Sequence, residues 1–463
     1  MTQGSPVSHI ISFALPLMAG NVFQQLYTVV DTMIVGKALG VDALAALGAS
    51  DWLNWMMLGI IQGLTQGFAI QMAQDFGAGQ HKQLRQTMGN SAILAVLSTL
   101  VLLIVGQTAA APMLVLLHTP PEIMGNALLY LRIVFAGVPI VMSYNMLASI
   151  LRALGDGKTP LRAMIVASLT NIALDLLFVL GFRWGIAGAA AATLIAQAIS
   201  GVFCLLVIRK ISILSCTKND FRLRAQTAGK LFVLGLPMAF QNSIISIGGM
   251  IVQTVVNGFG VIFIAGFTAT NKLYGILEIA ATSYGYAMTT YVGQNMGAGE
   301  FARIRKGVRS ALWISLVTSG VIAMCMLLFG RIILSYFLSG SEQVVNQAIG
   351  IAYRYLAIMS VCLPILYLLH IIRSALQGMG NTLLPMVSGI AEFVMRAVAA
   401  LLFPYMMGEN GIFYAEVTAW SGADVILVCS YFWVLRRIVR KTFKDRTEES
   451  DVAETLIESS NCR

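Results

Sequence analysis

Long apolar stretches separated by short polar ones dominate this chain from near its start to about residue 436. Roughly twelve of them reach the length of about 20 residues that a helix needs to cross the hydrocarbon core of a bilayer. They lack the period-2 alternation of barrel strands, so the pattern predicts helices. The stretches lie near residues 9–36, 43–73, 88–110, 123–150, 160–181, 186–209, 228–256, 261–292, 307–336, 343–373, 383–406 and 411–436.

The pattern repeats itself once along the chain. Leu15-Pro16 returns as Leu236-Pro237, and Gly77-Ala78-Gly79 returns 220 residues later as Gly297-Ala298-Gly299. Each half holds six helices, an even number, so both halves have the same orientation in the membrane. The predicted fold class is therefore an all-α membrane protein with twelve transmembrane helices in two pseudo-symmetric six-helix bundles.

The repeat and the charges also predict the domain boundaries. Residues 1–210 form an N-terminal lobe (N-lobe), 211–230 a basic cytoplasmic linker and 231–440 a C-terminal lobe (C-lobe). Residues 441–463 are polar and acidic, with too few apolar residues to pack, so we expect a disordered cytoplasmic tail.

Composition and charge agree with a membrane protein. Of the 463 residues, 57% are hydrophobic and 11% charged, whereas soluble domains carry about 25% charged residues. The net charge of +9 invites a nucleic-acid interpretation, but the basic residues lie in short loops between apolar stretches. Such loops are typically cytoplasmic. We therefore expect no nucleic-acid partner, a multi-pass protein of the inner (plasma) membrane, and both termini in the cytoplasm.

Asp31 is the most informative residue of the first stretch, because a carboxylate at membrane depth is costly unless it is protonated, paired or hydrated. Tyr27 lies one helical turn earlier on the same face. The aligned position in the second half is Val252, so the acid belongs to one half only. Asp31 is either a helix-end acid that reaches the membrane interface or a protonatable cation site.

A second polar set lies further along the first half. Asn171 and Asp175 are four residues apart, on one face of an otherwise apolar helix, and Thr193 follows a run of small residues in the next helix. An amide and a carboxylate together suit Na⁺ coordination or a proton relay, because hard cations prefer oxygen ligands. Each residue alone is a weak signal, since a lone Thr in a helix usually bonds its own backbone.

These motifs together resemble those of multidrug and toxic compound extrusion (MATE) transporters. The resemblance includes Tyr27-x-x-x-Asp31, both Gly-Ala-Gly turns, Gly155-Asp156-Gly157-Lys158-Thr159-Pro160, Asn171-x-x-x-Asp175 and the run ending at Thr193, and it covers residues 9–436. It implies two six-helix lobes and cation-coupled efflux of organic cations. It also implies a cation site, transiently holding Na⁺ or H⁺, at Asp31, Asn171, Asp175 and Thr193, with Tyr27 close by.

The second half offers weaker candidates for a substrate cleft. Glu278 is either an anion of the cleft or a locally paired structural group. Glu392 and Arg396 are four residues apart, with the acid first, which favours an intrahelical ion pair, although a role in the cleft is the alternative. Tyr274, Tyr284 and Met288 could line a cleft for aromatic cations, but such side chains more often serve packing.

The leading hypothesis is a monomeric secondary antiporter that exports amphipathic organic compounds, mostly cations, in exchange for H⁺ or Na⁺. The alternative is a flippase for lipid-linked oligosaccharides, whose cleft needs cationic residues for pyrophosphate.

No enzyme is predicted, because nucleophile, base and metal ligands do not cluster. Gly157-Lys158-Thr159 is no P-loop, since Arg152 stands where the first glycine is required. We expect no cofactor beyond the coupling ion and no structural metal, because the scattered Cys and His residues lack ligand spacing.

Overall fold

The structure is a computed structural model that describes residues 1–337 and 342–461. Each of the twelve predicted stretches corresponds to one helix or one broken helix. The first half comprises α1 (Pro6–Leu39), α2 (Val41–Gly77), α3 (His81–Leu116), α4 (Pro121–Ala136), α5 (Val138–Ala153), α6 (Lys158–Asp175), η1 (Leu176–Gly181) and α7 (Ile186–Ile208). The connecting segment holds the short helices η2 (Ser212–Leu214) and η3 (Lys218–Phe221). The second half comprises α8 (Ala225–Val256), η4 (Asn257–Phe259), α9 (Val261–Gly297), α10 (Phe301–Ser335), α11 (Glu342–Val361), α12 (Leu363–Gly378), α13 (Leu383–Met407), η5 (Gly408–Tyr414) and α14 (Ala415–Asn461).

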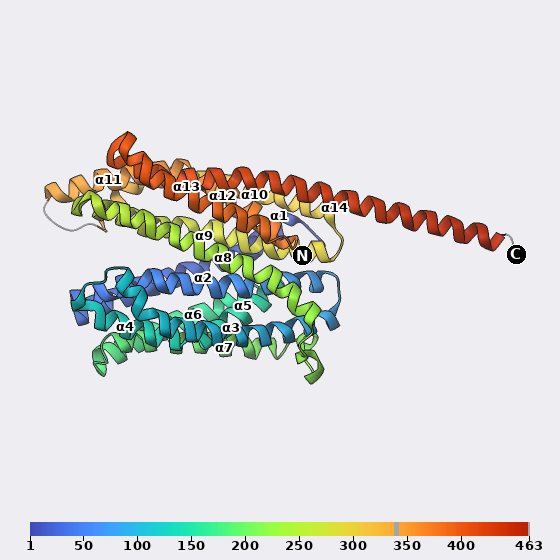
Figure 1. Cartoon of the computed structure of the whole chain (residues 1–463), viewed down its shortest axis with the longest axis horizontal. Helices are drawn as coiled ribbons and strands as arrows, with labels where there is room; N and C mark the ends of the chain where they lie inside the picture. The colour runs from blue at the N-terminus through green and yellow to red at the C-terminus, as the bar shows by residue number, and fades with distance from the viewer. Residues whose placement is uncertain (338–341, 462–463) are drawn as a thin grey trace.

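The helices form two bundles that lie side by side (Figure 1). Two of the predicted spans are broken. The break between α4 and α5 bends the chain by 48°, and the one between α11 and α12 lies at Cys362. Each break is followed by a proline, Pro139 or Pro364, which lacks the backbone N–H that would continue the helix.

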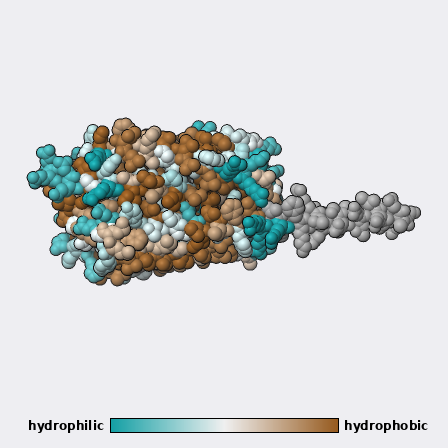
Figure 2. All heavy atoms as spheres, turned by 90° about the horizontal axis from the view of Figure 1, so that it is seen from above, coloured by the Kyte–Doolittle hydropathy of each residue, from teal (hydrophilic) through white to brown (hydrophobic). Residues whose placement is uncertain are grey.

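Nine stretches of the described chain are long and apolar enough to cross a membrane, or ten if the bent pair is one span. This number is below twelve partly because residues 383–438, which include all of α13 and the first half of α14, form one continuous apolar stretch. In addition, α9 has 37 residues but is not among the nine stretches. Hydrophobic side chains occupy the middle of the face seen in Figure 2, and hydrophilic ones gather toward its two ends, as expected for a membrane-spanning body.

The repeat is preserved in the helix boundaries. Helices α2 and α9 both have 37 residues, and each boundary of α9 lies 220 residues after that of α2. The glycine before each helix has a positive φ, 87° at Gly40 and 93° at Gly260. Glycine adopts this conformation without the strain that a Cβ would cause. The predicted pseudo-symmetry of the two bundles is confirmed.

The lobes meet along a close contact between α2 and α8. A Cβ on Gly67 would lie 2.3 Å from the Cα of Gly235, and one on Gly63 would lie 2.4 Å from the backbone nitrogen of Ala239. Only glycine permits the two helices to approach this closely. Two glycines one turn apart therefore fix the position of α8 against the N-lobe.

A reciprocal pair of hydrogen bonds joins the lobes at the end of the molecule that holds the N-terminal residues, the Gly-Ala-Gly turns and the linker. We call this the basic end. Gln74 Nε2 donates to the carbonyl of Gly378 at 3.0 Å, and its repeat counterpart Gln294 donates to the carbonyl of Ala153 at 2.8 Å. At Gly77, a Cβ would lie 1.9 Å from the carbonyl oxygen of Gln294. The motif that revealed the repeat thus also holds the lobes together at this end.

The division of the core differs in detail from the predicted lobe boundaries. Ile10 and Leu17 of α1 pack in the core of the C-lobe, whereas Leu231 and Ala239 of α8 pack in the core of the N-lobe. Near the basic end, α1 and α8 each lie between the two bundles and contribute to the opposite one. A boundary drawn along the sequence cannot represent this exchange.

The C-terminal segment also differs from the expectation. Helix α14 continues to Asn461 and extends beyond the bundles (Figure 1), whereas disorder was predicted from residue 441. Residues 441–461 contain neither glycine nor proline and include several Glu, Lys and Arg residues, which favour helix. The prediction considered packing alone. Residues 462 and 463 lie outside the described chain.

Candidate functional site

The polar residues predicted for the N-lobe meet at membrane depth. Asp31 comes from the second half of α1, Asn171 and Asp175 from the end of α6, and Thr193 from α7. Asn171 Nδ2 lies 3.4 Å from Thr193 Oγ1, and the carboxyl groups of Asp31 and Asp175 interact with each other. Three helices therefore bring one amide, one hydroxyl and two carboxyl groups together.

The site contains more hydrogen-bond acceptors than hydrogen-bond donors. Oδ1 of Asp31, Oδ1 of Asn171 and both carboxyl oxygens of Asp175 are buried and have no hydrogen-bond partner within the described chain. Asp175 is 0% exposed and Asn171 1%. Buried polar atoms without partners are costly in a protein interior. A cation or protons placed among these oxygens would remove that cost.

Additional polar groups surround this site. Tyr27 interacts with Asp31 and Asp175, as the resemblance implied. Tyr130 of α4 also interacts with both carboxyl groups, and the charge of Asp51 in α2 acts on Asp31. Asp51 and Tyr130 were not singled out from the sequence, because nothing in the local pattern places α2 and α4 against the middle of α1.

The backbone changes conformation at the site. Asp175 is the last residue of α6, and the next six residues form the π-helix η1. A π turn contains an extra residue and is frequent at functional sites. Asp175 therefore lies at the point where the α-helix passes into a π-helix.

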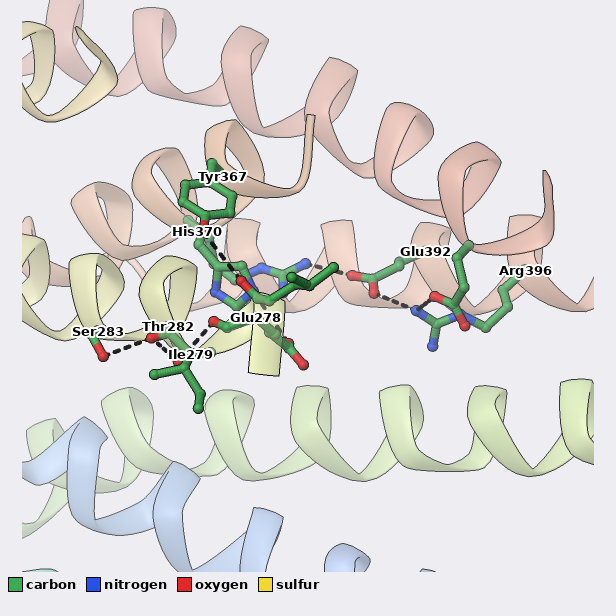
Figure 3. A network of polar contacts seen from close by, with 11 residues as sticks. Glu278, Ile279, Thr282, Ser283, Tyr367, His370, Glu392 and Arg396 are labelled. Carbon is green, nitrogen blue, oxygen red and sulfur yellow. Dashed lines mark hydrogen bonds and ion pairs between the residues drawn. The ribbon is translucent and has the colours of Figure 1, made fainter. Parts of the chain in front are cut away.

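The acids of the C-lobe are arranged differently (Figure 3). Glu392 of α13 accepts a 2.6 Å bond from Arg373 Nη2 of α12 and a 2.9 Å bond from Arg396 Nη2. Arg396 Nη2 also lies 2.8 Å from Glu416 of α14. Glu392 and Arg396 are 3% and 4% exposed. The structure therefore contains the predicted intrahelical pair, extended by two further charges into a buried network.

The remaining C-lobe candidates are half-buried or lie in the C-lobe core. Glu278 is half-buried, with His370 Nε2 at 3.6 Å (Figure 3). Tyr274 stacks on Trp420 with ring centroids 5.9 Å apart. Tyr284 is 6% exposed and Met288 0%, so both pack in the C-lobe core.

Sequence reasoning missed two members of the C-lobe network and a buried acid beside it. Arg373 was not considered, and Glu416 and Asp424 were left without a role, because isolated charges near helix ends resemble interface groups. Asp424 of α14 is 6% exposed, and neither of its carboxyl oxygens has a hydrogen-bond partner in the described chain. The charges of Arg373 and Glu392 act on it. No signal in the sequence alone brings α12 and α14 together at these residues.

The profile of the MatE family matches residues 16–177 and 237–402, once in each half of the chain. The chain belongs to the MATE family. Among its relatives is the Bacillus subtilis "probable multidrug resistance protein YoeA", 27% identical over 92% of this chain and 94% of that protein. A Thermotoga maritima "probable multidrug resistance protein NorM" is 27% identical over 90% and 89%.

The fold of this MATE protein is also that of solved transporters. A transporter of the MOP superfamily from Pyrococcus furiosus superposes with a TM-score of 0.87 at 23% identity, covering 95% of this chain and 97% of the other. The predicted family and fold class are confirmed, and the chain is a multi-span membrane transporter.

Proposed function

We propose that this MATE protein is a secondary antiporter that exports amphipathic organic cations in exchange for H⁺ or Na⁺. The multidrug resistance names of its relatives support drug efflux as the transported class. The coupling site in this proposal comprises Asp31, Asn171, Asp175, Thr193 and Tyr27. The buried oxygens without partners are the observation that carries the assignment.

The electrostatics of the two lobes favour a cation at this site. Asp31 and Asp175 interact with each other, and no basic side chain forms an ion pair with either of them in the described chain. Two neighbouring carboxylates away from water repel each other unless a cation or a proton intervenes. Binding and release of that ion would then bias the relative positions of the lobes.

The orientation follows from the distribution of basic residues. Both termini lie on the same side of the bundles (Figure 1), together with the linker that contains Lys218, Arg222 and Arg224. Basic loops favour the cytoplasm, so we assign the basic end to the cytoplasm of a plasma-membrane protein. The reciprocal bonds of Gln74 and Gln294 would then close the cytoplasmic side.

The alternative of a lipid-linked-oligosaccharide flippase receives less support. Such a protein needs cationic groups free to hold pyrophosphate. The buried guanidinium groups of Arg373 and Arg396 already bind Glu392 and Glu416. The buried carboxyl oxygens without hydrogen-bond partners belong to Asp31, Asp175 and Asp424, and Asp31 and Asp175 have no basic partner in the described chain, which favours a cationic ligand.

The test measures accumulation of a fluorescent lipophilic cation in inside-out vesicles, where export appears as uptake into the lumen, with an imposed pH gradient and with and without Na⁺. We expect gradient-driven transport by the wild type and at least a tenfold loss in Asp31→Asn, because the amide cannot bind or release the coupling charge. Asp42→Asn removes an exposed acid at the start of α2 and is the matched control.

The outcome with Na⁺ identifies the ion. Transport that needs Na⁺ in the absence of a pH gradient assigns sodium, and transport that depends on the pH gradient alone assigns the proton. Normal, gradient-dependent efflux by Asp31→Asn would remove Asp31 from the coupling site. Efflux that responds to neither gradient would refute the antiport proposal and redirect the work to assays of lipid flipping.

A further inference from the structure

A charged pocket lies at the basic end, remote from both groups of buried acids. It has a volume of about 410 Å³ and opens between the start of α3 and the linker. Four basic side chains and one acidic side chain line it, namely Lys82, Arg85, Arg222, Arg224 and Asp220. The two basic loops, 130 residues apart in the sequence, thus form a single pocket with three excess positive charges.

Buried contacts hold the linker against α3. Asn90 is fully buried; its Nδ2 donates to the carbonyl of Arg222 at 3.2 Å, and its Oδ1 accepts from the N–H of Arg224 at 2.8 Å. At Gly89, a Cβ would lie 2.1 Å from the carbonyl oxygen of Asp220. An amide that binds the backbone at two points and a glycine that permits close approach make this pocket a defined part of the fold.

The charges of the pocket are only partly compensated. The backbone N–H of Thr217 and its hydroxyl, together with the nearby Arg85, hold the pKa of Asp220 below its ordinary value. Asp220 is therefore ionised near neutral pH and lies 4.0 Å from Arg85. Lys82 and Arg222 have exposed side chains with no hydrogen bond or ion pair within the described chain. Two cations thus remain available to an anion.

Apolar side chains alternate with the basic ones along the linker. Arg222 and Arg224 have extended backbone conformations, and successive side chains of an extended segment point to opposite sides. Both arginines line the pocket, whereas Phe221 and Leu223 do not and are 48% and 55% exposed. At the end of a membrane-spanning bundle, this alternation places apolar groups where acyl chains begin and cations where headgroups lie.

We propose that this pocket binds the phosphate of an anionic phospholipid headgroup, with Phe221 and Leu223 inserted among its acyl chains. Basic pockets on the cytoplasmic side of membrane helices suit such headgroups. A free phosphate shares the headgroup chemistry, but it would gain nothing from the two exposed apolar side chains. The bound lipid would fasten the linker between the lobes to the N-lobe. This site is independent of the coupling ion.

The test uses the purified full-length protein, stripped of lipid and titrated with phosphatidylglycerol, phosphatidylcholine or inorganic phosphate under native mass spectrometry. We expect phosphatidylglycerol to bind most tightly. Lys82→Gln/Arg222→Gln should weaken it about thirtyfold, from about fivefold for each surface charge removed. Phe221→Ser/Leu223→Ser should weaken binding of the lipid and leave that of inorganic phosphate unchanged.

The control Lys210→Gln/Lys218→Gln removes the same amount of charge from the same end of the molecule, at residues in and next to the linker that do not line the pocket. It should bind phosphatidylglycerol like the wild type, and Lys82→Arg/Arg222→Lys, which keeps the charge, should do the same. If both charge-removing pairs weaken binding of phosphatidylglycerol equally, then general surface charge and not this pocket attracts the lipid, and the proposal is overturned. Binding of phosphatidylglycerol that is no tighter than that of inorganic phosphate, and that is unaffected by loss of Phe221 and Leu223, would overturn the assignment to lipid.

Discussion

The two lobes share a fold but neutralise their buried acids in different ways. In the N-lobe, Asp31 and Asp175 face each other with buried oxygens that have no partner. In the C-lobe, Glu392 lies between two guanidinium groups, with contacts of 2.6 and 2.9 Å. One half thus carries counter-charges of its own, whereas in our proposal the other half relies on an exchangeable cation. The difference suggests that a duplicated fold can assign coupling to one lobe and rigidity to the other.

The energetic reason lies in the cost of burying charge. A buried carboxylate loses its hydration, and only a close, well-oriented opposite charge compensates for that loss. Arginine provides a permanent charge that cannot leave. A proton or Na⁺ provides one that can, so the site without arginine is the one suited to an ion-driven cycle. Three predictions test this contrast, from the largest expected effect to the smallest.

Breaking the C-lobe network should produce the largest effect on stability. Glu392→Gln leaves the buried Arg373 and Arg396 without their shared carboxylate, and we expect a loss of about 3–5 kcal/mol in the free energy of unfolding. Denaturant titration in detergent micelles measures it. Glu122→Gln, at an exposed acid of α4, should change stability little. Equal stability of both variants would show that the arginines are not essential counter-charges.

Removing an acid from the N-lobe site should not lower the stability of the protein, in contrast to the C-lobe. Asp175→Asn removes one of two neighbouring acids, so in cation-free buffer the variant should be at least as stable as the wild type. Saturating coupling ion, either Na⁺ or protons, should stabilise the wild type by about 2–3 kcal/mol at a hundred times its dissociation constant. The variant should lose that increment.

Thermal unfolding in Na⁺ against choline, and in mildly acidic against mildly alkaline buffer, measures the increment. The Glu122→Gln protein should keep it in full. A variant at Asp175 that retains the full increment would contradict the assignment of this carboxylate to the ion.

The sequence indicated the N-lobe site because its residues violate a local pattern. Asp31 interrupts an apolar stretch, and helical spacing alone puts Asn171 and Asp175 on one face of an apolar helix. That these residues form one site with Asp31 and Thr193 was implied by the family resemblance. The repeat of the Gly-Ala-Gly turns likewise reveals the two lobes. These signals act within about one helical turn or through direct comparison of the halves.

The rest depends on contacts between helices that no local pattern encodes. Arg373 and Glu416 lie on different helices, and only the packing of α12, α13 and α14 brings them to opposite ends of the same ion network. Asp51 likewise approaches Asp31 only through the position of α2. The π turn after Asp175 was also not predicted, because its sequence, Leu-Leu-Phe-Val-Leu-Gly, differs little from that of an ordinary apolar helix.

Asp424 tests the difference between the lobes most closely, because it lies in the C-lobe but, like the N-lobe acids, has no hydrogen-bond partner for its buried oxygens. Its two carboxyl oxygens are buried without a partner in the described chain, although the charges of Arg373 and Glu392 act on it. The two arginines are already shared between Glu392 and Glu416, so we expect Asp424 to be neutral and to hold a proton. Asp424→Asn, which is nearly isosteric with the neutral acid, should then change the free energy of unfolding by less than about 1 kcal/mol. Denaturant titration beside Glu392→Gln measures the difference. A loss as large as that of Glu392→Gln would show instead that Asp424 is a charged member of the network, and the C-lobe would then carry one acid more than its arginines can neutralise.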